Sequence, residues 1–425
     1  MNVLVIGSGA REHAIVAALE RDPSVEEICC APGNAGIAVD TATAAVDITD
    51  PAAIAELARR RKADLVVIGP EVPLVAGAAD ALVEAGIACF GPTAAAARLE
   101  GSKTFAKEVM AAAGVATAAA RTCTTPEEVA AALDEFGAPH VVKDDGLAAG
   151  KGVVVTDDRA VALAHAQACI AGSSTVLVEE YLDGPEVSLF CITDGRTVVP
   201  LRPAQDFKRV GDGDEGPNTG GMGAYTPLDW APADLAETVV RDIAQPTIDE
   251  MRRRGTPFSG VLYVGLALTS KGIRVVEFNA RFGDPETQSV LAMLSTPLGG
   301  LMNAAAHGRL AEHPPLSWLD GASVTVVLAA HGYPSSPRTD DPIVVGGGPV
   351  PGTLILHAGT RTNGEQVVSS GGRVLSIVSV GEDLAAARRL AYEQIAHIRL
   401  AGSHYRSDIA AKAERGEVVV PGRGR

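Results

Sequence analysis

Short, unbroken apolar runs alternate with segments of helical periodicity over the first hundred residues. The apolar runs occupy residues 3–6, 28–30, 65–68 and 88–90. Continuous apolar strands that alternate with helices predict a parallel sheet covered by helices on both faces. A glycine-containing turn follows each run, and ligands of open α/β sheets bind at the carboxyl edge of the strands. The pattern therefore predicts an N-terminal α/β domain with a binding cleft at that edge.

The pattern changes near residue 102, where a predicted helix leads into an α+β region. The helix is predicted at 103–113, with strands at 140–143, 153–156, 176–181, 187–192, 261–268 and 273–278. A polar, glycine-rich segment at 205–225 has no periodicity and is predicted to be a long functional loop. Proline and glycine signals near 313–321 predict a domain boundary. Beyond it we expect a small domain with strands at 324–328 and 374–380 and a helix at 384–398.

Composition narrows the range of partners. The 425 residues carry 36 lysines and arginines against 52 aspartates and glutamates, a net charge of −16. Nucleic-acid and anionic-membrane binding need a basic surface, so we expect neither partner. No apolar run approaches the roughly 20 residues that span a bilayer. The six cysteines form no C-x-x-C pair and no signal-peptide pattern is present, so we expect a reduced, cytoplasmic protein that handles small molecules.

The first strand is followed by a Gly-Ser-Gly turn that resembles the start of a dinucleotide fingerprint. The third glycine of that fingerprint falls at Glu12, and no acidic residue ends the second strand, so NAD is not favoured. Arg11 and His13 lie in the first turn of the following helix, where backbone amides and the helix dipole attract an anion. We expect a phosphate-bearing ligand here; the alternative is a tight turn with a solvated arginine.

A second glycine-rich segment, at 146–152, departs from a Walker A loop because its spacing is short and Gly152 replaces the magnesium-binding Ser or Thr. It joins two predicted strands, so we expect a hairpin loop whose backbone amides cover phosphates. The alternative is a flexible hairpin without a ligand. Lys143 ends the apolar strand before the loop, and a half-buried ammonium group needs a counter-anion.

The strand at 273–279 has the most informative pattern. Period-two alternation places Glu277 and Asn279 on one face, followed by Arg281 and Asp284. A carboxylate and an amide oxygen on one face suit Mg²⁺ that also binds nucleotide phosphates. The alternative is an edge strand whose polar residues face solvent.

Eleven segments, spread in order along the chain, carry a family resemblance: VLVIGSGAREHA, APGNAG, GPEVPLVAG, FGPT, LEGSKTFAK, DGLAAGKGVVV, VEEYLDGPEVS, QDFKRVGDGDEGPNTGGMGAY, VEFNARFGDPETQ, HAGT and GGRVL. With them the chain resembles the phosphoribosylamine–glycine ligase family of the ATP-grasp superfamily. The resemblance implies an α/β parallel-sheet (pre-ATP-grasp) substrate-binding domain at 1–102. It further implies an ATP-grasp catalytic domain at 103–316, with a small mobile lobe at about 118–190, and a C-terminal domain at 320–425.

The resemblance also implies a reaction in de novo purine biosynthesis. Glycine, ATP and 5-phosphoribosylamine would give glycinamide ribonucleotide, ADP and phosphate through glycyl phosphate, on a monomeric enzyme. Arg281 and Lys208 would be catalytic, with Arg281 stabilising charge on the phosphoryl group and the tetrahedral intermediate. Glu277 and Asn279 would hold Mg²⁺ or Mn²⁺.

The resemblance also implies two sets of binding residues. The residues implied in ATP binding are Lys103, Lys143, Gly150, Lys151, Gly152, Glu179, Glu180, Tyr181, Leu182 and Glu186. The residues implied in binding glycine and the sugar phosphate are Gly9, Arg11, Glu12, His13, Asn34, Gly36, Pro70, Glu71, Asp206, Asn218, Thr219, Gly220, Gly221, Met222, Gly223, Asp284, Pro285 and Glu286.

Two departures from the family pattern bear on ATP. Asp144 replaces the small residue that usually follows the strand lysine, and the 171–175 segment is short. Three other functions remain as alternatives. A biotin-dependent carboxylase would need bicarbonate, and the chain has no biotin-accepting Met-Lys-Met. A dehydrogenase would lack its acidic residue and third glycine. A non-catalytic nucleotide-binding regulator is expected to have lost Glu277, Asn279 or Arg281.

Overall fold

Five parallel strands form the N-terminal sheet in the order β3-β2-β1-β4-β5. In this computed structural model, which describes residues 1–146, 152–173 and 175–422, the strands are β1 (Asn2–Gly7), β2 (Glu27–Pro32), β3 (Ala42–Thr43), β4 (Leu65–Ile68) and β5 (Ala88–Phe90). Successive residues of β1 enter opposite cores: Leu4 packs in one hydrophobic cluster and Val5 in another. Both faces are therefore covered, as the unbroken apolar runs predict.

Short helices connect these strands and cover the sheet. They are α1 (Ala10–Leu19), α2 (Ile37–Asp40), α3 (Pro51–Arg60), α4 (Glu71–Ala76), α5 (Ala78–Glu84) and α6 (Ala94–Gly101). Helix α3 begins where the Asp50 side chain accepts hydrogen bonds from the backbone amides of Ala52 and Ala53, a capping arrangement that satisfies otherwise unpaired donors.

The central sheet is antiparallel and has the order β11-β10-β16-β17. Its strands are β10 (Glu186–Asp194), β11 (Val198–Pro200), β16 (Ser259–Thr269) and β17 (Gly272–Asn279). The associated helices are α7 (Lys103–Ala113), α10 (Leu235–Val239), α11 (Gln245–Arg253) and α13 (Leu298–Ala306). Helix α7 has the bounds that the sequence predicts.

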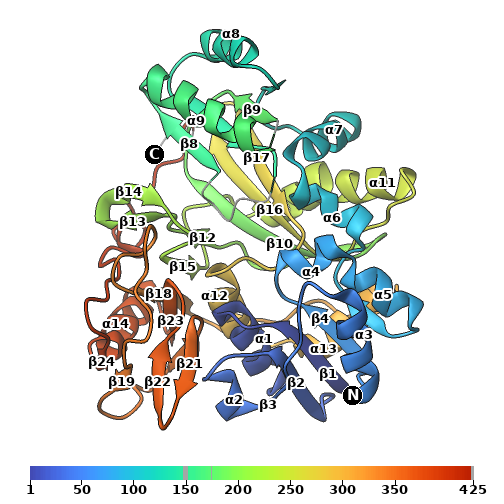
Figure 1. The fold of residues 1–425 in the computed structure, drawn as a ribbon, viewed down its shortest axis with the longest axis vertical. Coiled ribbons are helices and arrows are strands. Elements are labelled where there is room, and N and C mark those ends of the chain that lie inside the picture. Colours follow the sequence, from blue (N-terminus) through green and yellow to red (C-terminus); the bar gives the residue numbers. More distant parts are fainter. Residues whose placement is uncertain (147–151, 174, 423–425) are drawn as a thin grey trace.

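A small lobe lies at one end of the molecule (Figure 1) and has its own hydrophobic core. Its antiparallel sheet has the order β6-β9-β7-β8. The elements are β6 (Ala120–Cys123), α8 (Pro126–Phe136), β7 (His140–Asp144), β8 (Val153–Thr156), α9 (Arg159–Ser173) and β9 (Val176–Glu179). Strands β7 and β8 pair directly, which confirms the predicted hairpin around the glycine-rich segment.

The predicted long loop at 205–225 is wrong as a description of the backbone. It contains β12 (Gln205–Asp206), a hairpin of β13 (Arg209–Gly211) and β14 (Glu215–Asn218), and β15 (Gly223–Thr226). Strand β15 pairs with β18 (Ala322–Ala329), about a hundred residues further along the chain. Local periodicity does not reveal a strand whose partner is so distant, because the partner supplies the pairing.

Strands β12 and β15 belong to a five-stranded sheet with the C-terminal strands, in the order β12-β15-β18-β23-β20. The remaining C-terminal elements are β19 (Val344–Val345), β20 (Thr353–His357), β21 (Thr360–Asn363), β22 (Gln366–Ser369), β23 (Arg373–Gly381), α14 (Leu384–Ile395), β24 (Ile398–Arg399) and α15 (Ala411–Glu414). This sheet therefore contains strands from both sides of the domain boundary predicted at 313–321. Helix α14 ends three residues before the predicted 398, where β24 pairs with β19.

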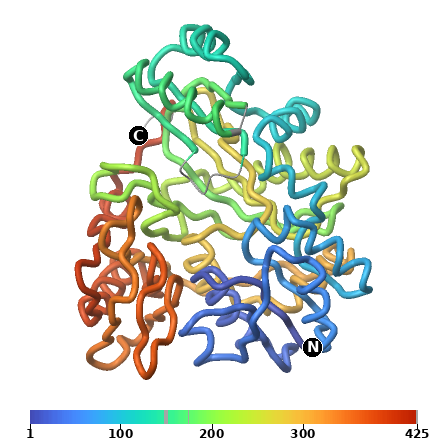
Figure 2. The backbone as a smooth tube through the Cα atoms, viewed as in Figure 1, coloured from blue at the N-terminus to red at the C-terminus, as the bar shows by residue number. Residues whose placement is uncertain are grey.

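Helix α12 (Glu286–Met293) is buried at the centre of the molecule, with α1 on one side and the C-terminal sheet on the other (Figure 1). The tube in Figure 2 shows the first and last parts of the chain side by side, opposite the small lobe. None of the described helices is long and apolar enough to cross a membrane.

Candidate active site

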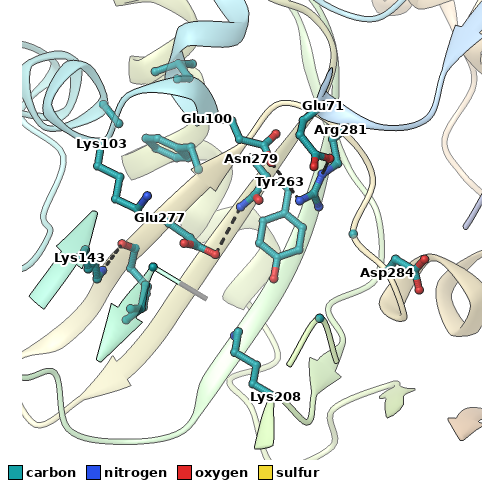
Figure 3. Close-up of a pocket in the computed structure, with 18 of the residues that line it drawn as sticks. Glu71, Glu100, Lys103, Lys143, Lys208, Tyr263, Glu277, Asn279, Arg281 and Asp284 are labelled. Carbon is teal, nitrogen blue, oxygen red and sulfur yellow. Dashed lines mark hydrogen bonds and ion pairs between the residues drawn. The ribbon is translucent and has the colours of Figure 1, made fainter. Parts of the chain in front are cut away.

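A pocket of about 340 Å³ opens where the N-terminal sheet, the central sheet, the small lobe and the C-terminal sheet meet. Most of its described polar lining was predicted from the sequence (Figure 3). The charged and polar lining residues are Arg11, Glu71, Glu100, Lys103, Lys107, Lys143, Glu179, Asp206, Lys208, Thr219, Tyr263, Glu277, Asn279, Arg281, Asp284, Glu286 and Arg373. Pro70, Gly146, Gly152 and Gly220 also line it.

Strand β17 presents Glu277 and Asn279 on one face, as alternation predicts. The Asn279 amide nitrogen donates to Glu277 Oε1 at 3.5 Å, so the amide oxygen of Asn279 is left for another partner. A carboxylate and an amide oxygen side by side fit Mg²⁺, which takes one or two protein oxygens and completes its shell with phosphates and water. The two residues therefore fit the metal that the resemblance implies.

A buried ion-pair network surrounds Lys143. Its Nζ lies 2.6 Å from Glu179 Oε2, and Lys107 Nζ lies 2.8 Å from Glu179 Oε1. Burial works against the charged lysine, but the carboxylates of Glu179 and Glu277 outweigh it and raise the pKa of Lys143. Glu179 is the counter-anion that Lys143 needs. Its carboxylate contacts the two lysines, so any contact of this residue with an adenine comes from its backbone.

An irregularity in β17 adds a second contact for Lys143. The pairing of β17 with β16 shifts between Gly265 and Leu266, leaving Val276 as the extra residue. The Val276 carbonyl then accepts a hydrogen bond from Lys143 Nζ at 3.3 Å. Such bulges redirect backbone and side-chain groups next to functional sites. Lys103 is held separately, because its Nζ donates to the Gly146 carbonyl at 3.0 Å.

Arg281 is held between two carboxylates of the N-terminal region. Its Nε lies 3.2 Å from Glu71 Oε2, and its Nη2 lies 2.9 Å from Glu100 Oε1. Glu100 Oε2 also accepts from the backbone amide of Ala280 at 2.7 Å. Burial alone lowers the pKa of Arg281, but Glu100 and Glu71 outweigh it and raise the pKa. The guanidinium group is therefore charged and fixed in orientation beside the β17 pair.

Asp206 and Lys208 form the opposite wall. Lys208 Nζ lies 3.2 Å from Asp206 Oδ1 and 2.5 Å from Glu186 Oε2. Burial, with a smaller contribution from Glu286 and Glu186, raises the pKa of Asp206 to about 7, against the opposing effect of Lys208. Asp206 is thus a carboxyl group that changes charge near neutral pH.

Behind that wall, Tyr263 hydroxyl donates to Glu286 Oε1 at 2.9 Å, and Ser188 Oγ donates to the same oxygen at 3.0 Å. The two hydroxyl oxygens are 2.7 Å apart. These hydrogen bonds fix the predicted Glu286. Sequence reasoning missed Tyr263 and Ser188, because each lies within an apolar strand and carries no motif of its own.

The C-terminal sheet contributes Arg373, which the sequence analysis also missed. Arg373 Nη1 donates to the Asp284 carbonyl at 2.7 Å, and its Nη2 lies 3.3 Å from the Asp284 carboxylate. It also donates to the Gly220 carbonyl. The Gly220 amide donates to the Tyr333 hydroxyl at 3.0 Å. The turn at 219–221 and the start of α12 are therefore joined by C-terminal side chains.

Glu100 and Lys107 were within reach of sequence reasoning. Both lie within the LEGSKTFAK segment, and Lys107 is four residues after Lys103 on α7. Residues four apart share a helix face, so Lys107 was the natural companion of Lys103.

Three predicted substrate-binding residues are not among those that line the described pocket but contact the C-terminal sheet, so their role in substrate binding stays a prediction. The His357 amide donates to His13 Nδ1 at 2.8 Å, and Asn34 Nδ2 donates to the His357 carbonyl at 2.7 Å. A Cβ at Gly36 would lie 2.4 Å from the His357 ring. A motif residue that binds a neighbouring segment is indistinguishable in sequence from one that binds a ligand.

Other predicted residues lie beneath the pocket surface. Glu12 is buried, and its carboxylate accepts from Gly9 N at 2.6 Å and from Arg11 Nε at 2.5 Å. Glu12, which stands where a dinucleotide fingerprint has its third glycine, therefore fixes the turn and orients Arg11. Met222 is fully buried. The other predicted residues outside the described lining are Gly9, Asn218, Gly221, Gly223 and Pro285.

Of the predicted adenine and ribose residues, Glu179 lines the described pocket, whereas Glu180, Tyr181, Leu182 and Glu186 are not among its lining residues. Glu180 pairs with Lys271 at 3.3 Å, Tyr181 is half exposed, and Glu186 binds Lys208. Gly150 and Lys151 lie outside the described residues, as does residue 174 of the short segment. Asp144, the unusual residue after Lys143, accepts a hydrogen bond from the Gly146 amide at 3.5 Å.

Comparison with known families covers nearly the whole chain. The phosphoribosylglycinamide synthetase family matches over three segments: its N domain at residues 1–100, its ATP-grasp (A) domain at 101–287 and its C domain at 323–412. A phosphoribosylamine–glycine ligase of Streptomyces coelicolor is 64% identical over 417 residues, which cover 97% of this chain and 99% of that protein. Its counterpart in Mycobacterium leprae is 58% identical over 426 residues, covering 99% and 100%.

Solved structures agree with these matches. The crystal structure of phosphoribosylamine–glycine ligase from Thermotoga maritima is 34% identical, covers 96% of this chain and 100% of its own, and has a TM-score of 0.84. A biotin carboxylase from Campylobacter jejuni reaches a TM-score of 0.73 at 16% identity, with 95% and 92% covered. That second likeness concerns the fold alone.

Proposed function

The chain belongs to the phosphoribosylglycinamide synthetase family, and we propose that its pocket joins glycine to 5-phosphoribosylamine with ATP. The products are glycinamide ribonucleotide, ADP and phosphate, in purine biosynthesis. The observation that carries the proposal is the meeting of the three family segments at one pocket, with lysines, Arg281 and two adjacent oxygen ligands on its walls. This set suits phosphoryl transfer to a carboxylate.

The first step activates glycine. A glycine carboxylate oxygen forms a bond to the γ-phosphorus of ATP while the bond from that phosphorus to the ADP oxygen breaks, giving glycyl phosphate. Lys103 and Lys143 hold the phosphate oxygens, and Arg281 stabilises charge on the transferred group. Mg²⁺ or Mn²⁺, when held by Glu277 and Asn279, neutralises charge on the phosphates.

In the second step the amine nitrogen of phosphoribosylamine attacks the carbonyl carbon of glycyl phosphate. The tetrahedral intermediate then expels phosphate and loses a proton, leaving the amide. Arg281 faces this centre with its orientation fixed by Glu71 and Glu100. Asp206, together with Lys208, is proposed to bind the two charged ends of glycine, while Arg11 and the 219–220 turn bind the sugar phosphate.

A covalent enzyme intermediate is not part of this proposal. Among the described residues that line the pocket, there is no cysteine, serine or histidine to act as nucleophile or as its base. Glycine labelled with oxygen-18 in its carboxylate distinguishes the two routes. One label is expected in the released phosphate; unlabelled phosphate, or a glycyl adduct on the protein by mass spectrometry, would exclude glycyl phosphate.

The overall reaction is tested by phosphate release from ATP with glycine and freshly prepared phosphoribosylamine, omitting each component in turn. Release is expected only with all three. Bicarbonate-dependent release without glycine would favour the carboxylase alternative, and NAD binding by calorimetry at the N-terminal turn would favour the dehydrogenase.

Finer points complete the proposal. We propose Mg²⁺ or Mn²⁺ as the metal and a monomeric, cytoplasmic enzyme. Adenine contacts are proposed at 179–182 and ribose contacts at Glu186, with domains at 1–102, 103–316 and 320–425. Sedimentation of the protein at micromolar concentration tests the monomer. The identity of the metal is tested by treating the enzyme with a chelator and measuring which divalent ion restores activity.

A further inference from the structure

The segment that carries Asp206 and Lys208 has two faces. Asp206 and Lys208 line the pocket, while Phe207 between them packs away from it against the main hydrophobic core. This alternation is expected for extended backbone. The segment continues into the β13–β14 hairpin, whose tip at 212–215 carries three acidic residues. Whatever fixes Phe207 and the hairpin therefore fixes the pocket wall.

Arg406, from the C-terminal region, contacts both. Its guanidinium group lies 4.9 Å from the centre of the Phe207 ring. Its Nη1 lies 2.9 Å from Asp214 Oδ1 and donates to the Arg209 carbonyl at 3.2 Å. Nε and Nη2 each donate to the Asp408 carboxylate at 2.7 Å. Only 1% of the side chain is exposed, so all of its interactions are with protein.

The residues next to Arg406 strengthen the same contact. The Ser407 amide donates to Asp212 Oδ1 at 2.8 Å, and the Gly213 amide donates to Asp408 Oδ2 at 2.9 Å. The hairpin tip is thus bonded to one short C-terminal segment nearly two hundred residues away in sequence. Arg406 is the buried cation at its centre, because it pairs with both Asp214 and Asp408. The other cation near Asp214, Lys412, lies 3.5 Å from its Oδ2 and is mostly exposed.

We propose that Arg406 is a positioning residue for the reaction: it holds Phe207 and the β13–β14 hairpin so that Asp206 and Lys208 face the pocket. The proposal rests on the proposed function for its kinetic consequence, but the structural part stands alone. A guanidinium group is required because one planar fork serves a carboxylate, a second carboxylate, a carbonyl and an aromatic face at once. A lysine carries the charge without that geometry.

The test compares three variants with the wild-type protein. Arg406→Gln removes the charge, and Arg406→Lys keeps it without the fork. Arg388→Gln is the matched control, because Arg388 donates to the carbonyls of Ser407 and Ile409 and stacks on Tyr392, all within the C-terminal region. The control loosens the same segment without breaking the contact to the hairpin.

Two readouts are used. Steady-state kinetics should show the KM for glycine raised about 10-fold in Arg406→Gln and Arg406→Lys, with the dissociation constant of ADP within twofold of wild type. Hydrogen exchange over residues 205–219 should be faster in both, and unchanged in Arg388→Gln. Equal glycine KM and equal exchange in the Arg406 variants would overturn the proposal, as would an Arg388→Gln variant that shows the same changes.

If Arg406→Gln does not fold, the less disruptive variant Asp214→Gly tests the proposal. Asp214→Gly removes the hairpin carboxylate but leaves the Arg406–Asp408 fork, and glycine accepts the positive φ of 63° at this position. Faster exchange over 205–219 is again expected, and unchanged exchange overturns the proposal. If the wild-type protein lacks ligase activity while the exchange result holds, the proposed function alone has failed.

Discussion

Arg281 Nη2 lies 2.9 Å from Glu100 Oε1, so the arginine at the pocket is oriented by the last turn of a helix that belongs to the N-terminal region. The same carboxylate accepts from the amide of Ala280. Glu100 therefore fixes both the side chain and the backbone at the end of β17, although it is remote in sequence from the residues it orients.

Glu100→Gln tests this relationship. The amide can still accept one hydrogen bond but no longer pairs with the guanidinium charge, so Arg281 loses one of its two carboxylates. We expect kcat to fall by about 10- to 100-fold, with the KM for ATP changed less than threefold. Glu56→Gln, which removes a carboxylate from an exposed pair with Arg59, should leave kcat unchanged; a similar loss there would contradict the assignment.

Glu277→Ala is expected to preserve the fold and lower turnover by about 100-fold or more, because charge on the transferred phosphoryl group is no longer neutralised. The measurement is kcat at several Mn²⁺ concentrations, with the unfolding midpoint as a check on the fold. Asn279→Asp, which keeps an oxygen ligand, should retain more activity. Near-normal metal dependence in Glu277→Ala would remove this residue from the ligand set.

Glu179→Gln should destabilise the protein, because it leaves the ammonium groups of Lys107 and Lys143 without their shared carboxylate. Only 7% of the Lys143 side chain is exposed, so water cannot replace that carboxylate. Breaking a buried pair from one side costs about 3–5 kcal/mol. Chemical denaturation of the variant measures the loss. Glu135→Gln breaks the exposed pair with Arg121 and should cost less than about 1 kcal/mol; equal losses would mean that the buried network adds nothing.

Asp206 predicts a pH dependence of glycine use. Burial raises its pKa to about 7, so the carboxyl group is protonated below that pH and charged above it. Because the charged form is the one proposed to bind the glycine ammonium group, kcat/KM for glycine should rise with pH up to about 7 and then level off. Asp206→Asn should lower the plateau about 10- to 100-fold and remove the rise; a rise that persists would assign it to another group.

His357 predicts a pH dependence of stability. Burial first, and then the neighbouring His13, lower its pKa from 6.5 to about 4. Between those values the unfolded chain binds a proton that the folded protein does not, so stability is full above pH 6.5 and is lost as pH falls toward 4. The loss between pH 7 and pH 5 is about 2 kcal/mol. His357→Gln should reduce this slope, whereas substitution of the exposed His307 by Gln should not.

Local pattern was sufficient for the parts of the site that a single strand or helix defines. Alternation along β17 predicted that Glu277 and Asn279 share a face. The position of Lys143 at the end of an apolar strand predicted that its ammonium group needs a counter-anion. The identity of that anion was not predictable as a contact, because Glu179 reaches Lys143 only through the pairing of β9 with β7. The family motif contained Glu179, but it did not reveal the side-chain partner.

Contacts between distant segments account for the rest. Arg373 and Arg406 lie more than 150 residues from the turn and hairpin that they contact. Arg373 lies in the GGRVL segment, but that segment does not reveal its partners, and Arg406 lies in none of the family segments. His13 and Asn34 show another case, in which motif residues form hydrogen bonds with His357 of a neighbouring strand that the motif itself does not reveal. The 205–225 segment was predicted to be a loop because its strands are defined by β18, which closes the pairing from far along the chain.

The sheet shared by β15 and β18 also fixes the order in which the protein matures on the ribosome. The segment that bears Asp206 and Lys208 emerges with one edge of its strands unpaired, and such edges associate with other chains until they are covered. Strands β18 and β23 are translated about one hundred and one hundred and fifty residues later. The pocket wall that carries Asp206 and Lys208 is therefore completed only when synthesis is nearly finished, and a nascent chain released early exposes an aggregation-prone edge.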